Sequence, residues 1–181
     1  MKIIVSFLLL LSLLHADREG GPYIGAGIGL SKYNDDNLYA SLQEDTSKSL
    51  TFYGGAYINR HLSVELAYVS FDSWHVDKGY EVDSTKSLGF GALSVSTLAH
   101  YAFFEDALDF YAKFGVGEMT LGGINSSGFT MLVGGGAGYR LNDWLSVKVA
   151  YDVYVFDYDD VNEARYSMQI DYIYTAVEVQ F

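Results

Sequence analysis

Residues 23–31 read Tyr-Ile-Gly-Ala-Gly-Ile-Gly-Leu-Ser, a regular alternation of two kinds of side chain. The even-numbered positions, such as Ile24 and Ile28, are apolar, whereas the odd-numbered positions from 25 to 31 hold only glycine or serine. Successive side chains of a β-strand point to opposite faces. This stretch therefore predicts a strand with one apolar face and one nearly bare face.

The period of two returns along the rest of the chain. Residues 62–68 read Leu-Ser-Val-Glu-Leu-Ala-Tyr and residues 145–151 read Leu-Ser-Val-Lys-Val-Ala-Tyr, with opposite charges at one position of the less apolar face. Both segments lack the three- and four-residue spacing of an amphipathic helix. We predict eight strands, over residues 22–33, 48–58, 62–72, 86–102, 108–120, 129–140, 145–156 and 166–181.

Composition limits the class of protein. The chain has 181 residues, no cysteine and a formal net charge of −12. The length suits one domain with a real core, and the acidic balance argues against a nucleic-acid partner. The lack of cysteine excludes disulfides, thiolate metal sites and a cysteine nucleophile. We expect no cofactor and no metal site.

The N-terminal segment is predicted to be a signal peptide. A short basic start precedes an almost unbroken apolar run over residues 3–14, and the small residue Ala16 offers a cleavage site. The run is short for a membrane span, which needs about 20 residues. We therefore expect residues 1–16 to be a cleaved signal and residues 17–181 to form the mature domain, with no transmembrane helix.

The predicted connections differ in length between the two ends of the strands. Three are short (59–61, 104–107 and 141–144), three are long and polar (34–47, 73–85 and 157–165), and residues 121–128 form an intermediate one. Short turns at one end and longer loops at the other are typical of an outer-membrane barrel. Its closure would satisfy every backbone group in hydrocarbon.

The two faces decide between a soluble and a membrane barrel. A soluble barrel turns its bulky apolar face inward, but the other face here, with glycine, tyrosine and a few charges, suits water poorly. Turned inward, that face would fill a narrow lumen. The sequence therefore predicts an all-β fold, an eight-stranded antiparallel up-and-down transmembrane β-barrel with Phe181 at the periplasmic interface.

The mature chain resembles the OmpA-like, opacity-protein family of eight-stranded outer-membrane barrels. The likeness covers the whole mature chain and is carried by residues 23–30, 64–68, 111–115, 136–140 and the terminal Phe181. It implies a location in the outer membrane of a Gram-negative bacterium, without the peptidoglycan-binding domain of larger members. It also implies a C-terminal signal for the barrel-assembly machinery, formed by Ile173, Thr175, Val177, Val179 and Phe181.

Charged residues on the inward face are the first candidate site. In the predicted register they are Glu65, Lys113, Arg140, Lys148, Asp152 and Glu178. Lys148 and Glu178 fall at similar depth on neighbouring strands and are expected to pair, because an unpaired ion in a narrow lumen is costly. The network either plugs the lumen, the interpretation we favour, or rearranges to pass small ions.

An enzymatic site is not expected. Of the three histidines that follow the signal, His61 and His100 fall near the periplasmic end and only His75 near the extracellular rim. A lipid-modifying barrel enzyme needs its base near that rim, held beside a nucleophile and oriented by a third group. Neither a His-x-Ser motif nor a matching cluster lies there.

The predicted loops and strand ends carry two further patterns. The acidic stretches 34–37, 77–83 and 157–163 could offer oxygens to divalent cations, but they lack the spacing of a calcium loop and favour a solvated negative surface. Aromatic residues at opposite strand ends predict two interfacial girdles. We expect Tyr139, Trp144 and Phe181 at the periplasmic side, and Tyr33, Phe71, Tyr158 and Tyr166 at the extracellular side.

These observations favour a monomeric outer-membrane barrel with a structural or surface-interaction role. Its expected partners are outer-membrane lipid and lipopolysaccharide, the assembly machinery, and a host or surface ligand at the loops. The second hypothesis is a narrow gated channel for small solutes or ions. The third is a lipid A-modifying barrel enzyme.

Overall fold

Eight antiparallel strands make up the described part of the chain. The computed structural model describes residues 20–34, 46–74, 88–104, 106–121, 126–159 and 165–181. The strands are β1 (Gly21–Asn34), β2 (Thr46–Asn59), β3 (Leu62–Trp74), β4 (Leu88–Phe103), β5 (Leu108–Leu121), β6 (Ser126–Arg140), β7 (Leu145–Asp159) and β8 (Arg165–Gln180). All eight predicted strands are confirmed, and their ends move by at most three residues. The predicted signal peptide and its cleavage site lie outside the described residues, as do the acidic loop tips and His75.

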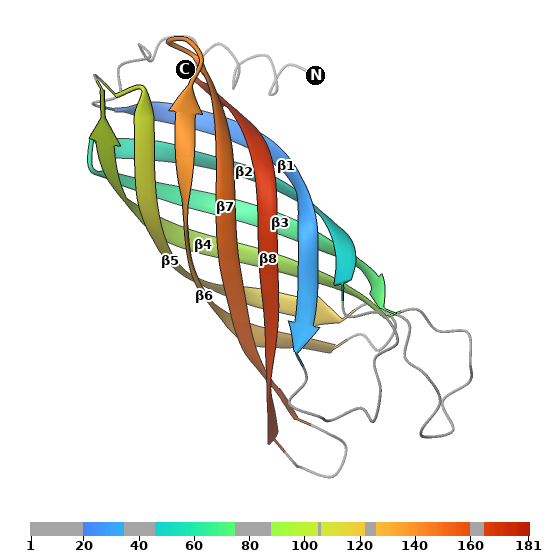
Figure 1. Cartoon of the computed structure of the whole chain (residues 1–181). Helices are drawn as coiled ribbons and strands as arrows, with labels where there is room; N and C mark the ends of the chain where they lie inside the picture. The colour runs from blue at the N-terminus through green and yellow to red at the C-terminus, as the bar shows by residue number, and fades with distance from the viewer. Residues whose placement is uncertain (1–19, 35–45, 75–87, 105, 122–125, 160–164) are drawn as a thin grey trace, which may run out of the picture.

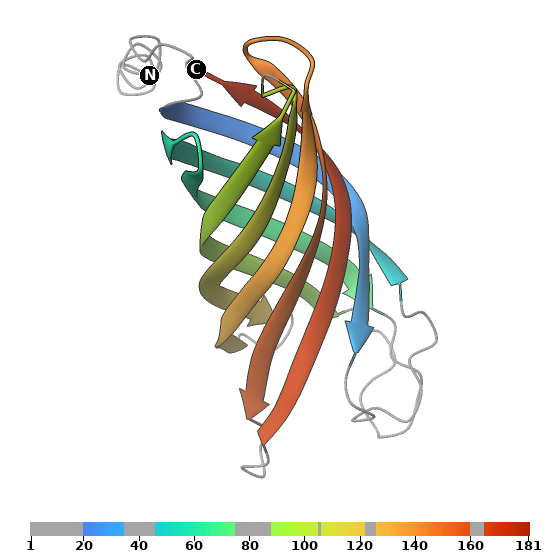
Figure 2. The same ribbon diagram turned by 60° about the vertical axis from the view of Figure 1, so that its left-hand side comes forward.

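The strands close into an up-and-down barrel. Each strand pairs with the next along the chain, and β8 pairs with β1 (Figures 1 and 2). We call one end of the barrel the turn end, because the tight connections β2–β3, β4–β5 and β6–β7 lie there, and the other the loop end. At the turn end the Phe181 N–H donates a hydrogen bond to the Pro22 carbonyl over 2.9 Å, which joins the C-terminal residue to the start of β1.

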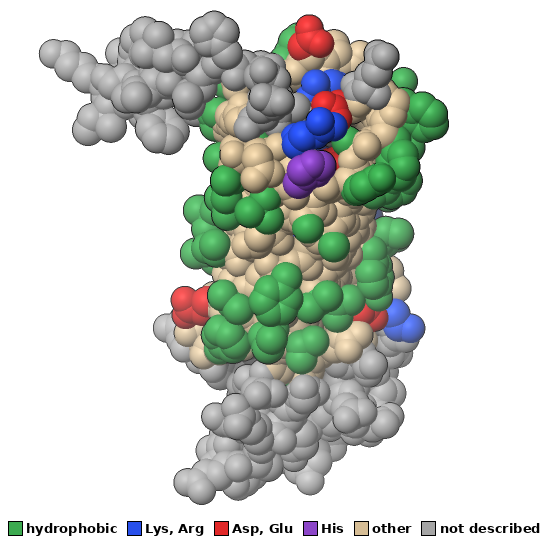
Figure 3. Space-filling view, turned by 90° about the vertical axis from the view of Figure 1, so that its left-hand side faces the viewer, with side chains coloured by type: hydrophobic (Ala, Val, Ile, Leu, Met, Phe, Trp, Pro, Cys, Tyr) green, Lys and Arg blue, Asp and Glu red, His purple; other side chains and the backbone are tan. Residues whose placement is uncertain are grey.

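The distribution of exposed side chains is inverted relative to a soluble protein. Side chains of Ile, Leu, Val and Phe project outward from every strand, and Ile28 is 70% exposed. Figure 3 shows these apolar side chains over the outer wall, with the charged side chains of this face toward the two ends of the barrel. An apolar outer wall with all strands paired satisfies the requirements of a lipid environment. None of the described segments is a helix long and apolar enough to cross a membrane.

The core of the molecule is the barrel lumen, which divides into two zones. Toward the turn end it holds charged side chains of β3, β5, β7 and β8, together with His100 of β4 and several hydroxyl groups. Toward the loop end it holds interlocking rings, with Tyr33 stacked on Phe90 at 5.7 Å and Phe71 edge-on to Tyr154 at 5.6 Å between ring centroids. Phe90 also contacts Phe156 at 6.3 Å.

The predicted extracellular girdle is wrong at the two positions that the structure describes. Tyr33 and Phe71 are only 6% and 2% exposed and point into the lumen. Strand parity explains the error, since Tyr33 is two residues after the inward Ser31 and Phe71 four after the inward Ala67. The side chains of Tyr158 and Tyr166 lie outside the described residues.

At the turn end, aromatic side chains do line the outer wall. Tyr139 and Trp144 project outward as predicted, whereas the side chain of Phe181 is half-buried. Further exposed rings on the β4–β5 hairpin extend this band, namely Tyr101, Phe103, Phe104 and Phe110. A band of rings at one level of the wall is typical of a membrane interface.

Candidate functional site

The inward-facing charges gather in the zone of the lumen near the turn end. Lys148 of β7 and Glu178 of β8 form a buried, hydrogen-bonded ion pair. They lie diagonally across the ladder, because Glu178 is opposite Ser146 and Lys148 is opposite Ala176. Partnering of this kind is what allows full charges to remain inside a protein.

Three tyrosines surround the Lys148 ammonium group. Its Nζ lies 5.1 Å from the ring centroid of Tyr23, 5.3 Å from that of Tyr111 and 5.6 Å from that of Tyr53. These distances fall within the range of cation–π attraction. We call Lys148, Glu178 and the three tyrosines the lysine cage.

Glycines on neighbouring strands make room for the rings of the cage. A Cβ atom added at Gly25 would collide with the ring of Tyr53, and one at Gly136 would collide with the ring of Tyr111. The glycines predicted on the inward face of residues 23–31 therefore have a steric role. They allow an aromatic ring of the neighbouring strand to approach the backbone closely.

A second ionic group lies beside the cage and is centred on Lys113 of β5. Its Nζ contacts Oε1 of Glu65 at 2.8 Å and Oδ2 of Asp152 at 3.1 Å. The Tyr174 hydroxyl donates to the same Asp152 oxygen over 3.3 Å. One ammonium group thus links β3, β5 and β7 across the lumen.

A hydrogen-bonded Ser–His–Asp chain continues the network toward the turn end. His100 Nδ1 lies 2.7 Å from Oδ2 of Asp109, and His100 Nε2 lies 2.8 Å from Oγ of Ser63. The hydroxyl of Tyr23 lies 3.3 Å from Ser63 Oγ and donates to Oε2 of Glu65, also over 3.3 Å. A single chain of polar contacts therefore connects Asp109 to the Lys113 group.

Sequence reasoning missed this chain because its members come from three strands. The sequence does contain a His-x-Ser spacing at His61 and Ser63, but His61 is exposed in the β2–β3 turn while Ser63 points into the lumen. The residue that meets Ser63 is His100, whose place was predicted only as near the same end of the barrel. Strand parity and closeness to the turns could have indicated that Ser63 and His100 meet. No local sequence motif could have done so.

The Ser–His–Asp contacts resemble those that activate a serine nucleophile. Ser63 is 0% exposed, however, and His100 lies between the rings of Tyr57 and Tyr111, with ring centroids 5.0 and 5.7 Å away. A substrate carbonyl needs open space beside the hydroxyl. In this packed position the chain satisfies three buried polar groups and ties β3, β4 and β5 together.

The remaining candidate residues lie apart from these groups. Arg140 is inward by parity but lies at the turn-end mouth, half-buried, where its Nη2 donates to Oε1 of Gln180 over 3.4 Å. On β8, Ile173, Thr175 and Val177 face outward with Val179 beside them. Among the described residues, no group of three or more His, Asp or Glu side chains could hold a metal ion.

Comparison with known proteins identifies the family. A family model described as the outer membrane protein beta-barrel domain matches residues 3–181. The chain belongs to this family. The match extends over nearly the whole sequence, so the chain is an outer-membrane β-barrel protein of the OmpA-like type found at the Gram-negative cell surface. Among curated proteins, none matches the chain.

Solved structures agree on the fold. Neisserial surface protein A is 15% identical, with a TM-score of 0.64 over 89% of this chain and 97% of its own. OprG from Pseudomonas aeruginosa is 14% identical, with a TM-score of 0.62 over 92% and 98%. Ail, the attachment invasion locus protein of Yersinia pestis, is 13% identical, with a TM-score of 0.56 over 90% and 99%. At these identities the likeness concerns the eight-stranded barrel alone.

Proposed function

We propose that this outer-membrane protein works through its walls and loops rather than through its lumen. In this proposal the lumen is plugged by side chains, and the barrel supports the membrane and displays acidic loops to surface ligands. The observation that carries the proposal is the two-zone filling of the lumen.

Each zone opposes conduction for a different reason. Near the turn end, Lys148 is paired with Glu178 and Lys113 with Glu65 and Asp152, so these lining charges are already neutralised by one another rather than available to a passing ion. The ring layer near the loop end, where Phe71 packs edge-on against Tyr154 and Tyr172, fills the lumen with aromatic side chains and narrows any path for water. A channel would have to open both zones at once.

The proposal also covers the orientation of the barrel in the membrane and its assembly signal. We place the turn end in the periplasm and the loop end outside, as is general for such barrels. The outward, alternating residues of β8 and the terminal Phe181 then serve as the signal for the barrel-assembly machinery. Phe181 is tied to Pro22 of β1, so this signal lies at the seam where the barrel closes.

Conductance tests the proposal directly. The mature chain is purified from the outer-membrane fraction, checked for a heat-dependent shift on a denaturing gel, and reconstituted in planar bilayers beside a general porin as positive control. We expect a heat-shifted protein that gives no current steps. Reproducible steps from the heat-shifted form would overturn the plugged lumen and favour a gated channel.

Enzymatic activity has its own readout. Cells that express the chain are compared with cells that express a Ser63→Ala variant, and the acyl chains of their lipid A are analysed by mass spectrometry. We expect identical profiles, because Ser63 is closed off from lipid. A change that depends on Ser63 would replace the proposal with a lipid-modifying activity.

A further inference from the structure

Both ring nitrogens of His100, the lumen histidine of β4, have a polar neighbour. Nδ1 lies 2.7 Å from Oδ2 of Asp109, and Nε2 lies 2.8 Å from Oγ of Ser63. A neutral imidazole carries one N–H group, whereas an imidazolium carries two. The charge on His100 therefore depends on whether Ser63 donates its proton to Nε2 or accepts a proton from it.

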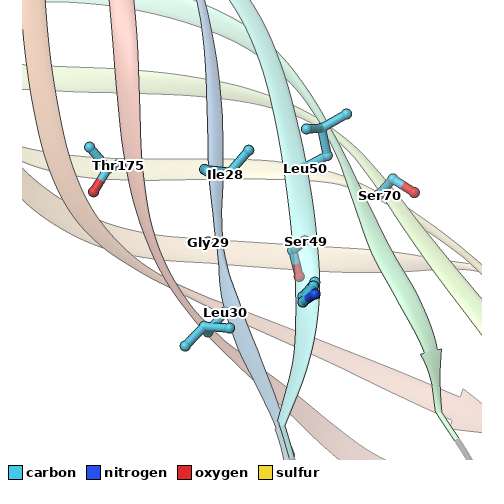
Figure 4. A pocket seen from close by; sticks show the side chains of 8 residues that line it. Ile28, Gly29, Leu30, Ser49, Leu50, Ser70 and Thr175 are labelled. Carbon is cyan, nitrogen blue, oxygen red and sulfur yellow. The ribbon is translucent and has the colours of Figure 1, made fainter.

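The group at the end of a hydroxyl chain sets the direction in which its members donate. The zone of the lumen near the loop end gives a simple case. Ser49, which lies beside Gly29 (Figure 4), donates to Oγ of Ser31 over 2.7 Å. Ser31 in turn donates to the carbonyl oxygen of Ser47 over 3.3 Å. Because a carbonyl only accepts, each hydroxyl before it points its proton toward it.

The chain that includes His100 ends on a carboxylate, which sets its direction in the same way. The Tyr23 hydroxyl donates to Oε2 of Glu65 over 3.3 Å and so uses its single proton. Oγ of Ser63 lies 3.3 Å from the Tyr23 oxygen, so the proton of that contact comes from Ser63. Ser63 then accepts on its other side, and Nε2 of His100 is the donor. The reverse direction would turn lone pairs of Ser63 and Tyr23 toward each other.

The other ring nitrogen also donates, because the ionised carboxylate of Asp109 only accepts. The separation of 2.7 Å between Nδ1 and Oδ2 is that of a charge-assisted hydrogen bond. The side chains of His100 and Asp109 are 1% and 3% exposed, and a carboxylate buried to this extent is stable only beside a positive partner. The two inward lysines of the described strands, Lys113 and Lys148, hold other carboxylates.

Groups from the surrounding strands bear on a positive charge at His100. The rings of Tyr57 on β2 and Tyr111 on β5 lie 5.0 and 5.7 Å from the imidazole, within the range of cation–π attraction. Glu178 on β8 attracts such a charge, and Lys148 on β7, the like charge, is hydrogen-bonded to Glu178. The other facing groups are Glu65 on β3, Tyr23 on β1 and, at the mouth, Arg140 on β6, which donates to Gln180.

We propose that His100 holds a structural proton and remains an imidazolium at about pH 8, where an exposed histidine is mostly neutral. The protonated ring joins β4 to β5 through Asp109 and to β3 through Ser63. An imidazolium that donates from both nitrogens cannot take a proton from Ser63, so the same hydrogen bonds leave that serine without a general base. Because the charged form is the one bonded on both sides, alkali rather than acid releases these contacts. The inference does not depend on whether the lumen conducts.

Nitrogen-15 NMR spectroscopy of isotope-labelled mature barrels in detergent micelles tests the proposal. The chemical shift of each ring nitrogen reports whether it carries a proton, and a His100→Gln variant identifies the signals of His100. The exposed His61 serves as a reference in the same spectrum. At about pH 8 we expect both nitrogens of His100 to be protonated and one nitrogen of His61 to be unprotonated. An unprotonated nitrogen on His100 in the wild-type protein would overturn the proposal.

A serine variant and its matched control test the direction of the hydrogen bonds. Ser63→Ala removes the acceptor of Nε2 and should lower the pH at which His100 loses its proton by about one unit or more, the effect of losing one hydrogen bond to a charged group. Ser96→Ala removes another buried lumen hydroxyl, one without a hydrogen-bond partner among the described residues. It should leave the titration of His100 as in the wild type. Equal titrations in the two variants would overturn the assigned direction and with it the proposal.

Discussion

Removing the Lys148 ammonium group should destabilise the barrel strongly. In Lys148→Met the unbranched side chain keeps most of its length but loses the ammonium group, and the Glu178 carboxylate remains buried at 3% exposure without its partner. Breaking a buried pair from one side costs about 3–5 kcal/mol. Loss of attraction to the tyrosine rings acts in the same direction, by about 0.5–2 kcal/mol for a cation–π contact. We expect a loss of at least about 3 kcal/mol in the free energy of unfolding.

The assay is reversible urea unfolding in detergent micelles, followed by tryptophan fluorescence and by the heat-dependent gel shift. The control is Arg60→Met, whose side chain is 55% exposed and lies 3.9 Å from Asp106; exposed pairs contribute about 0–1 kcal/mol. The double variant Lys148→Met/Glu178→Gln removes both charges and should regain about half of the loss. If Lys148→Met costs no more than Arg60→Met, or if the double variant is less stable than the single one, the Lys148–Glu178 pair does not stabilise the barrel in this way.

Three further predictions concern the glycines, the Ser–His–Asp chain and the outer wall. Gly25→Ala should lower the free energy of unfolding by about 1–3 kcal/mol, because the new Cβ displaces the Tyr53 ring. In the same urea assay the outward Gly54→Ala, whose Cβ would only reach ordinary contact at 3.7 Å, should be near neutral, and equal losses would remove the steric explanation. A fluorophosphonate probe should leave Ser63 unmodified in the folded barrel, as read by peptide mass spectrometry; stoichiometric labelling would mean that the hydroxyl is reachable. Val95→Arg places a charge at an outward position in the middle of β4 and should cost about 2–4 kcal/mol in lipid vesicles, whereas Val95→Leu should not; similar stabilities would argue against lipid at that position.

Alternation in the sequence was sufficient to predict which face of each strand points inward, because strand parity is a local property. It placed Glu65 and Lys148 in the lumen and brought Lys148 to the depth of Glu178. The same rule, applied without counting from a known inward residue, misplaced Tyr33 and Phe71. Strand parity therefore predicts whether a side chain points inward or outward only when the alternation is counted from a known inward residue as far as the end of the strand.

Contacts across the lumen could not be predicted in the same way. Lys113 reaches both Glu65 and Asp152, on strands that are not its neighbours, because strand tilt and stagger bring these inward positions to one level. By contrast, Ser63, His100 and Asp109 are diagonal neighbours on adjacent strands, so strand parity and depth could have indicated their contacts. Stagger is a property of the closed sheet, and no single segment encodes it.

The Lys113 group also bears on the order of events during biogenesis. Glu65, Lys113 and Asp152 come from β3, β5 and β7, strands that are not neighbours in the sheet, so their contacts exist only after the sheet has curled round. Before the sheet closes, these charged side chains would be unpaired. An unpaired charge next to hydrocarbon is energetically unfavourable. Joining of β8 to β1 therefore neutralises the interior as well as completing the wall. A chain that inserts with a misaligned seam would leave the charges unmatched, and this gives assembly an intrinsic means of rejecting the wrong register.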